Sequence, residues 1–273
     1  METETGMQES RACGRFRLEG IKPLVGDYVT LEKEAEGATA LVTQILPRRN
    51  ELTRPRAANV DMLAVVLSPR KPRSDLLLCD KLLAEARRQA IAPAVIINKT
   101  DAWPELAAEL GREYRDAADV YLVSAQTGDG VRDLAEAMRG RTVCLTGQSA
   151  VGKSSLLNCL AGSNVRETGG LSRKTDRGRH TTRSVEIIDI PAYDLALIDT
   201  PGFSVLASPE EVDRPLAEFY PEFAPYAGRC RFDSCRHDRE PDCAVKAAVE
   251  AGAIERGRYE RYLKLLDEGQ GSL

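Results

Sequence analysis

Long apolar runs are absent from this sequence of 273 residues. No stretch approaches the roughly 18 consecutive apolar residues of a membrane-spanning helix. The acidic start, Met1 to Glu4, has no apolar core of the kind that marks a secretory signal. We therefore expect a cytoplasmic protein. The length exceeds that of one small domain and predicts about two domains, or three if small modules are attached.

A large excess of one charge is also absent. The net charge of −4 alone would argue against a nucleic-acid partner. Basic residues nevertheless gather locally, with seven between Pro47 and Arg73 and six between Arg166 and Arg183. Such patches decide contacts with nucleic acid more than the total charge does. The segment from Pro47 to Arg56 is either a solvated linker or an arm that lies along a phosphate backbone.

A glycine-rich segment in the middle of the chain carries the clearest signal. Residues 147–154 read GQSAVGKS, after the apolar run Thr142–Leu145 and before the helical pattern Ser155–Leu160. In this context the pattern predicts a nucleoside triphosphate cradle, in which backbone N–H groups and the helix N-terminus surround the phosphates. Lys153 would reach the outer phosphates and assist catalysis, and Ser154 would ligate Mg²⁺. The alternative is a glycine-rich turn that binds nothing. The predicted nucleotide contacts are Gly147, Gln148, Ser149, Ala150, Val151, Gly152, Lys153, Ser154 and Ser155.

Short apolar strands alternate with amphipathic helices ahead of this segment. Met62–Leu67, Ala94–Ile97 and Val120–Val123 are predicted strands, and Asp75–Ala90 is a predicted helix, as is a segment from Pro104. The alternation predicts an α/β fold with a mostly parallel sheet and helices on both faces. Ligands bind at the carboxyl ends of the strands in such sheets.

Two polar tetrads follow predicted strands at that edge, NKTD at residues 98–101 and SAQT at residues 124–127. The carboxylate of Asp101 can accept hydrogen bonds from two N–H groups of guanine that adenine lacks. The stem of Lys99 can lie over the base, and Asn98 can brace neighbouring loops. A backbone N–H of Ser124 or Ala125 can meet the guanine carbonyl. Helix capping by Asp101 is compatible with this role.

Two further segments match the switches of a GTPase. Asp199 at the start of the sequence DTPG would lie near Mg²⁺, and the N–H of Gly202 near the γ-phosphate. Between the phosphate loop and Asp199, residues 178–183 read GRHTTR and predict a mobile loop. A threonine there can cap the metal and sense the third phosphate. Thr181 and Thr182 both stay open for this role, with Thr181 named beside Ser154 as the Mg²⁺ ligand.

Phe203 follows Gly202 at the position where Ras-like GTPases place a water-orienting Gln. We therefore expect slow intrinsic hydrolysis until a partner completes the site. His180 is the candidate for positioning the attacking water. A histidine that contacts phosphate or lies exposed in the loop is the equally weighted alternative.

A cluster of three cysteines and one histidine lies late in the chain, with the spacing C-x4-C-x-H-x5-C. Soft thiolates and an imidazole suit tetrahedral Zn²⁺, and four protein ligands leave no open position, which predicts a structural site. Disulfides are rare in the cytosol, and three cysteines cannot all pair internally. We expect one zinc per chain, held by Cys230, Cys235, His237 and Cys243.

All five GTP-binding elements are thus present in an unusual order: base-reading loops, phosphate loop, then switches. In this order the sequence resembles the RsgA family of circularly permuted GTPases. The resemblance runs from about Arg15 to the C-terminal helices. It rests on Val25-Gly26-Asp27, Arg54-Pro55, Ala58-Asn59-Val60-Asp61, NKTD, GQSAVGKSS, GRHTT, DTPGF and the cysteine cluster.

The resemblance implies an N-terminal OB-fold, a permuted GTPase domain and a C-terminal zinc domain. It also implies GTP hydrolysis stimulated by the 30S subunit in late small-subunit maturation, with 16S rRNA as a contact. We expect an OB-like β module and basic linker at 1–56, the GTPase domain at 57–207 and the helical zinc domain at 208–273, in a monomer. The usual first strand of the OB-fold is missing or replaced by residues 1–9, so closure of the barrel stays open.

Other functions stay open at this stage. The strongest alternative is an RNA-binding GTPase switch with a non-ribosomal partner. A phosphate-loop kinase or ATPase would lack the discrimination by Asp101, and a comparison of GTP with ATP binding would identify it. An RNA-binding zinc and β protein with a degenerate nucleotide site would show no ribosome-dependent turnover.

Overall fold

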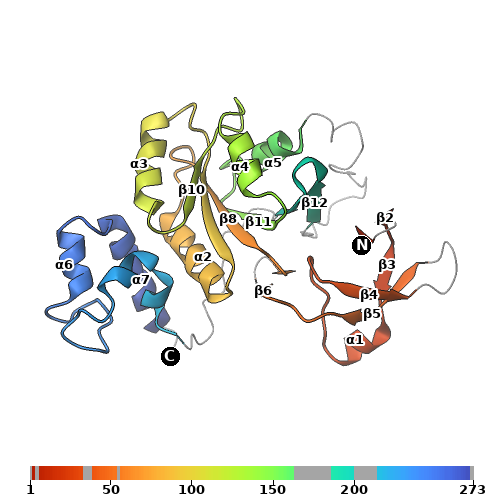
Figure 1. Cartoon of the computed structure of the whole chain (residues 1–273), viewed down its shortest axis with the longest axis horizontal. Helices are drawn as coiled ribbons and strands as arrows, with labels where there is room; N and C mark the ends of the chain where they lie inside the picture. Colours follow the sequence, from red (N-terminus) through yellow and green to blue (C-terminus); the bar gives the residue numbers. More distant parts are fainter. Residues whose placement is uncertain are drawn as a thin grey trace.

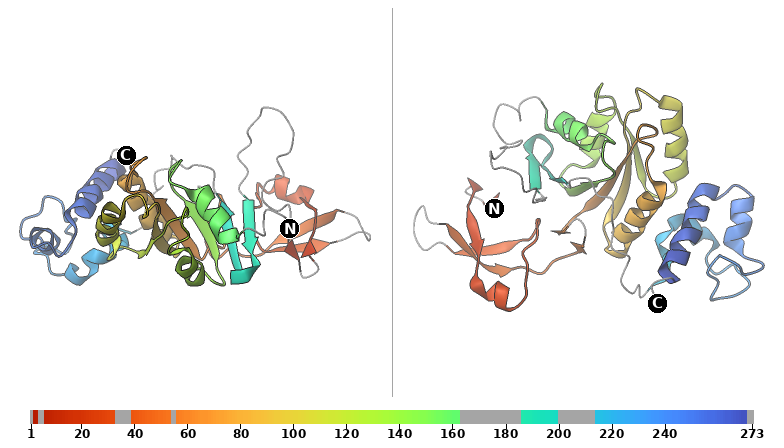
Figure 2. Two further views of the ribbon diagram at one scale, coloured as in Figure 1. Left: turned by 90° about the horizontal axis from the view of Figure 1, so that it is seen from above. Right: turned by 180° about the vertical axis from the view of Figure 1, so that it is seen from behind.

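The computed structural model describes residues 2–3, 6–32, 39–53, 56–162, 186–199 and 214–270. An α/β unit lies in the middle of an elongated molecule, between a small β module that contains the N-terminus and a helical unit that contains the C-terminus (Figures 1 and 2). None of the described helices is both long and apolar enough to span a bilayer.

The α/β unit is built on a six-stranded sheet with the order β10-β9-β8-β11-β13-β12. Neighbouring strands are parallel except for β12, which pairs antiparallel with β13. The strands are β8 (Met62–Leu67), β9 (Ala92–Ile97), β10 (Asp119–Leu122), β11 (Thr142–Thr146), β12 (Glu186–Ile190) and β13 (Leu195–Asp199). The predicted mostly parallel sheet is therefore confirmed. Strand β12 was not predicted; it joins β13 through the short 3-10 helix η2 (Pro191–Tyr193).

Helices cover both faces of this sheet, as the alternating pattern predicted. Helices α2 (Leu76–Arg88) and α3 (Pro104–Tyr114) pack on one face, and α4 (Val131–Ala137) and α5 (Lys153–Ala161) pack on the other (Figure 1). Every residue of β8 is buried, because side chains on both faces of this central strand meet helices. The carboxyl ends of β8, β9, β10, β11 and β13 therefore share one edge of a rigid sheet.

The N-terminal module contains an open sheet. In it β3 (Ser10–Ala12) pairs parallel with β5 (Ala40–Ile45), which pairs antiparallel with β4 (Val29–Glu32). The short helix α1 (Gly14–Leu18) follows β3, and the first residues form the ladder of β1 (Glu2–Thr3) and β2 (Gly6–Met7). Within the described residues this pairing does not close into a barrel.

The basic connector after this module is folded into the protein. Arg48 pairs with Asp27 and Glu51, and Arg49 pairs with Asp61. The connector carries the small ladder of β6 (Glu51–Leu52) and β7 (Ala57–Ala58). Both arginines are thus held against carboxylates of the chain itself, and contact of this segment with a phosphate backbone stays a prediction. Arg54 and Pro55 lie outside the described residues.

The C-terminal unit consists of two 3-10 helices and two α-helices around an aromatic core. Tyr220 and Phe223 stack in this core, and Tyr262 meets both rings edge to face, with ring centroids 5.0 to 5.2 Å apart. Helix α7 also packs against α2 of the central unit. The elements are η3 (Leu216–Phe219), η4 (Pro221–Tyr226), α6 (Ala244–Glu250) and α7 (Arg256–Gln270).

Candidate GTP site and metal centre

The glycine-rich segment joins β11 to the N-terminus of α5 at the sheet edge described above. Gly147 and Gly152 have φ angles of +138° and +100°, which side chains disfavour. A Cβ on Gly147 would lie 2.4 Å from the carbonyl oxygen of Val66, and one on Gly152 would lie 2.2 Å from Nδ2 of Asn98. Both positions therefore require glycine, and the loop can turn its backbone N–H groups inward toward phosphate.

The lysine of this segment is folded back onto the loop. Nζ of Lys153 donates to the carbonyl oxygens of Gly147 and Gln148, at 2.6 and 2.7 Å. Burial lowers the pKa of Lys153, and the nearby charge of Asp199 acts in the opposite direction. The ammonium group thus lies beside the cradle and can exchange carbonyl oxygens for phosphate oxygens. Ser154 and Ser155, at the start of α5, are both exposed.

Asn98 connects the three loops of the site. Its Nδ2 donates to the carbonyl oxygen of Val151 at 3.0 Å, and its Oδ1 accepts from the N–H of Ala125 at 3.0 Å. The side chain is 2 % exposed, and the bond to Val151 is shielded from water. Nζ of Lys99 donates to the carbonyl oxygens of Ala150 and Lys71. Two of the residues predicted to read the base, Asn98 and Lys99, therefore lie directly against the phosphate loop.

Asp101 is held by the second tetrad. Its Oδ1 accepts a 2.6 Å hydrogen bond from Oγ of buried Ser124, and the residue is otherwise exposed at the sheet edge. The N–H of Ser124 donates to the carbonyl oxygen of Asp129, and that of Ala125 donates to Asn98. A guanine carbonyl at either N–H would have to share or displace these acceptors.

Among the predicted switch residues the structure describes Asp199 alone. It ends β13, and in the register of the sheet it pairs with Leu145 of β11. Asp199 therefore lies at the same edge as the phosphate loop. His180, Thr181, Thr182, Gly202 and Phe203 lie outside the described residues.

One contact at this site was not predicted. Oε1 of Gln148 accepts a 2.9 Å hydrogen bond from the N–H of Asp75, whose side chain caps the first turn of α2. The phosphate loop is thereby attached to the helix that carries the C-terminal unit. A glutamine inside a glycine-rich pattern gives no sequence signal for such a partner.

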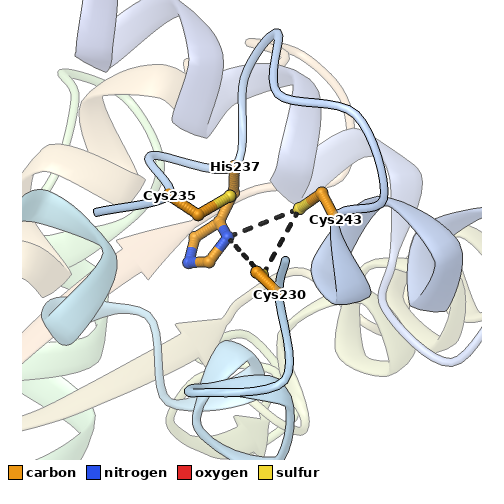
Figure 3. A group of neighbouring side chains, drawn as sticks. All are labelled: Cys230, Cys235, His237 and Cys243. Carbon is orange, nitrogen blue, oxygen red and sulfur yellow. Dashed lines mark hydrogen bonds between the residues drawn. The ribbon is translucent and has the colours of Figure 1, made fainter. Parts of the chain in front are cut away.

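The cysteine and histidine cluster converges in the C-terminal unit, as Figure 3 shows. The Sγ atoms of Cys230 and Cys243 are 3.9 Å apart, and each lies near Nδ1 of His237, at 3.6 and 3.5 Å. Together with Cys235, all four ligand atoms lie within 4.8 Å of one another. Tetrahedral zinc, with bonds of about 2.3 Å to sulfur and about 2.0 Å to nitrogen, would separate two sulfurs by about 3.8 Å and sulfur from nitrogen by about 3.5 Å. The cluster therefore fits a metal ion such as zinc.

The surroundings hold these ligands in place. Tyr259 and Tyr262 donate from their hydroxyl groups to the carbonyl oxygens of His237 and Arg236, at 2.7 and 2.6 Å. Burial lowers the pKa of His237, which favours the neutral imidazole that a metal requires. None of the seven cysteines forms a disulfide. The other four cysteines lie outside the cluster. Cys79 and Cys144 are buried in the core beside the sheet, and Cys13 and Cys159 are half-buried.

The comparisons with known proteins agree with this geometry. The profile of the RsgA GTPase family matches residues 45–208, and that of the RsgA N-terminal domain matches residues 1–41. The chain belongs to the RsgA GTPase family. It is 43% identical to the small ribosomal subunit biogenesis GTPase RsgA of Caldanaerobacter subterraneus, over 97% of this chain and 90% of that protein. It is 41% identical to the RsgA of Agathobacter rectalis, over 98% and 90%.

Solved structures of the RsgA type share the fold. YjeQ from Thermotoga maritima aligns with a TM-score of 0.77 and 33% identity, covering 97% of this chain and 91% of that one. YloQ, described as a circularly permuted GTPase, aligns with a TM-score of 0.76 and 32% identity, covering 100% and 90%. The predicted permuted GTPase fold and GTP-hydrolysing activity are therefore confirmed, and GTP or GDP with Mg²⁺ are the ligands that RsgA membership implies.

Asp101→Asn should test base recognition in this RsgA protein. The amide would lose the charge-assisted bonds that a carboxylate makes to two guanine donors, so GTP binding should weaken by about 2 kcal/mol or more. Isothermal titration of the variant with GTP would measure this loss. Asp129→Asn, a change in the neighbouring loop outside the predicted base contacts, is the matched control. Equal GTP affinity for wild type and Asp101→Asn would contradict the assignment.

Proposed function

We propose that this chain is a cytoplasmic, monomeric GTPase that binds the 30S subunit through 16S rRNA and hydrolyses GTP during late small-subunit maturation. The subunit would stimulate the hydrolysis. The curated relatives are named small ribosomal subunit biogenesis GTPases, which supports the ribosomal assignment. The observation that supports the nucleotide chemistry is Asn98, because its two hydrogen bonds join the NKTD and SAQT loops to the glycine-rich loop.

In the proposed site each element has one task. Asn98, Lys99, Asp101, Ser124 and Ala125 hold the base. Gly147 to Ser155 hold the phosphates, with Lys153 on the outer phosphates. Ser154 and Thr181 ligate Mg²⁺, with Thr182 as the other candidate threonine, and Asp199 and Gly202 lie near the metal and the γ-phosphate.

The proposed division of the chain follows the same tasks. Residues 1–56 form the OB-like module and connector, 57–207 the GTPase domain and 208–273 the zinc domain. One zinc per chain, on Cys230, Cys235, His237 and Cys243, would hold the last of these together. The near-tetrahedral spacing of the ligand atoms supports this assignment.

GTP hydrolysis measured with and without purified 30S subunits tests the function. We expect slow turnover alone and faster turnover with subunits, with ATP a poor substrate. Lys153→Ala, which removes the lysine of the phosphate loop, should abolish both rates and controls for contaminating nucleotidases. GTP turnover that subunits leave unchanged would remove the ribosome from the proposal and favour a GTPase switch with another partner.

His180→Ala tests how the partner acts. If 30S binding brings the imidazole to the attacking water, the variant should bind GTP and subunits yet lose stimulated turnover by a factor of order 10². Single-turnover hydrolysis on saturating subunits would measure the loss. Equal stimulated rates for variant and wild type would exclude histidine from the reaction.

A further inference from the structure

The loop between β8 and α2, residues 68–74, is a built structure. The N–H of Ser68 donates to Oγ of Ser74 at 2.8 Å, and that hydroxyl donates back to the carbonyl oxygen of Ser68 at 3.1 Å. Oγ of Ser68 donates to the carbonyl oxygen of Arg70 at 2.8 Å. Both serines are buried. The side chains that project from this loop therefore start from a fixed backbone.

Three of those side chains are basic and exposed: Arg70, Lys71 and Arg73. The ion pairs found among the described residues include none of them, whereas Arg48 and Arg49 of the connector are neutralised by carboxylates. The β8–α2 loop thus carries three of the seven basic residues between Pro47 and Arg73 without an ion-pair partner among the described residues. Cations without a carboxylate partner, carried on a well-held loop backbone, suit phosphate groups.

A cleft of about 370 Å³ opens beside this loop, between it and α3. Leu76, Leu106 and Leu110 give it apolar surface, and Leu106 is 39% exposed. Glu109 and Glu113 of α3 also line it. Glu113 pairs with Arg261. Among the described residues, none of the ion pairs includes Glu109, so its carboxylate can accept a hydrogen bond from a ligand. Cations at one side, an apolar surface and a carboxylate therefore meet in a single cleft.

We propose that this cleft binds one unpaired nucleotide of a single-stranded RNA segment. The flanking phosphates lie on Arg70 and Arg73, the face of the base packs on the leucines, and Glu109 accepts a hydrogen bond from an N–H group at the edge of the base. An acidic peptide fits less well, because it would supply carboxylates to Arg70 and Arg73 but no flat ring for the leucines and no ring-edge N–H for Glu109. The inference rests on the proposed function, which makes RNA the partner. It adds an RNA contact that the GTPase unit itself would make.

The cleft is connected to the GTP site. Nζ of Lys99 donates to the carbonyl oxygen of Lys71 at 3.0 Å and to that of Ala150 in the phosphate loop at 2.8 Å. A nucleotide held by the β8–α2 loop is therefore one hydrogen bond away from the lysine predicted to lie over the base. RNA bound here would favour one position of Lys99.

Fluorescence anisotropy with a short fluorescein-labelled single-stranded RNA tests the proposal on the full chain. Arg70→Ala combined with Arg73→Ala should weaken binding about tenfold and reduce the slope of log K against log salt by about 1.4, because two phosphate contacts are lost. Arg70→Lys with Arg73→Lys should keep the slope. Leu106→Ser should weaken binding without changing the slope. Arg132→Ala, an exposed arginine of α4 on the opposite face of the sheet, is the control and should change neither.

The outcomes separate this inference from the proposed function. If 30S subunits stimulate the wild-type GTPase but the double alanine variant binds RNA with wild-type affinity and slope, the cleft proposal fails alone. Equal binding of single-stranded and duplex RNA would also overturn it, since a paired base cannot enter the cleft. Competition by polyglutamate as strong as that by unlabelled RNA would assign the cleft to an acidic peptide instead. Absent stimulation by subunits is a failure of the proposed function, and the anisotropy series still decides the cleft.

Discussion

Cys235→Ser is expected to release the metal and unfold the C-terminal unit while the sheet unit stays folded. The four ligand atoms lie within 4.8 Å of one another, and they join the loop before α6 to the core under α7. Structural zinc contributes of order 10 kcal/mol to the folding of small domains at neutral pH, so loss of one thiolate removes much of what holds this loop. The aromatic core alone contributes less than the metal to the folding free energy of this unit.

Elemental analysis and hydrogen exchange would measure the two effects. Wild type should carry one equivalent of zinc, and amides of α6 and the ligand loop should lose protection in the variant while those of β8 and β9 keep it. Cys13→Ser, at a half-buried cysteine outside the cluster, should retain the metal and the protection. Full zinc occupancy in Cys235→Ser would show that Cys235 is not a ligand.

Local patterns predicted the elements of the central unit well. The buried strands are unbroken apolar runs, and the phosphate loop requires glycine at positions 147 and 152, where a Cβ would collide with Val66 or Asn98. Asn98 was predicted to brace loops, and its side chain does contact two of them. The NKTD and GQSAVGKS motifs were therefore recognisable in the sequence although their residues meet across the sheet edge.

Contacts between segments far apart in the sequence could not be predicted from local patterns. No partner inside the chain was predicted for the connector arginines, yet Arg48 pairs with Asp27, 21 positions earlier, through hydrogen bonds of 2.7 and 2.9 Å. Strand β12 escaped prediction because its stability comes from pairing with β13 and not from its own five residues. The attachment of α7 to α2 through Asp80 joins residues more than 170 positions apart. No local pattern marks such partners.

Asp80→Asn is expected to give the largest loss of stability among changes outside the metal centre. Asp80 lies in α2 with 1% exposure. Its carboxylate forms an ion pair with Nη1 of Arg258 at 2.6 Å, and it accepts hydrogen bonds from Nε of Arg261 at 2.6 Å and the hydroxyl of Tyr114 at 2.9 Å. Burial alone would lower the pKa of Arg258, but the charges of Asp80 and Glu222 raise it above its ordinary value. Removing the carboxylate would leave two buried guanidinium groups with too few anions, at a cost of about 3 to 5 kcal/mol in the free energy of unfolding.

Urea denaturation of the full chain, followed by circular dichroism, would measure this loss. Asp116→Asn is the matched control, because its partner Arg115 is 65% exposed and such surface pairs contribute less than about 1 kcal/mol. If Asp80→Asn is no less stable than the control, water must reach the arginines and the α2–α7 contact must be looser than its distances indicate. A large loss would show that α2 holds the C-terminal unit firmly. The phosphate loop then belongs to the same rigid connection, because Gln148 accepts a hydrogen bond from the N–H of Asp75, the N-cap of α2.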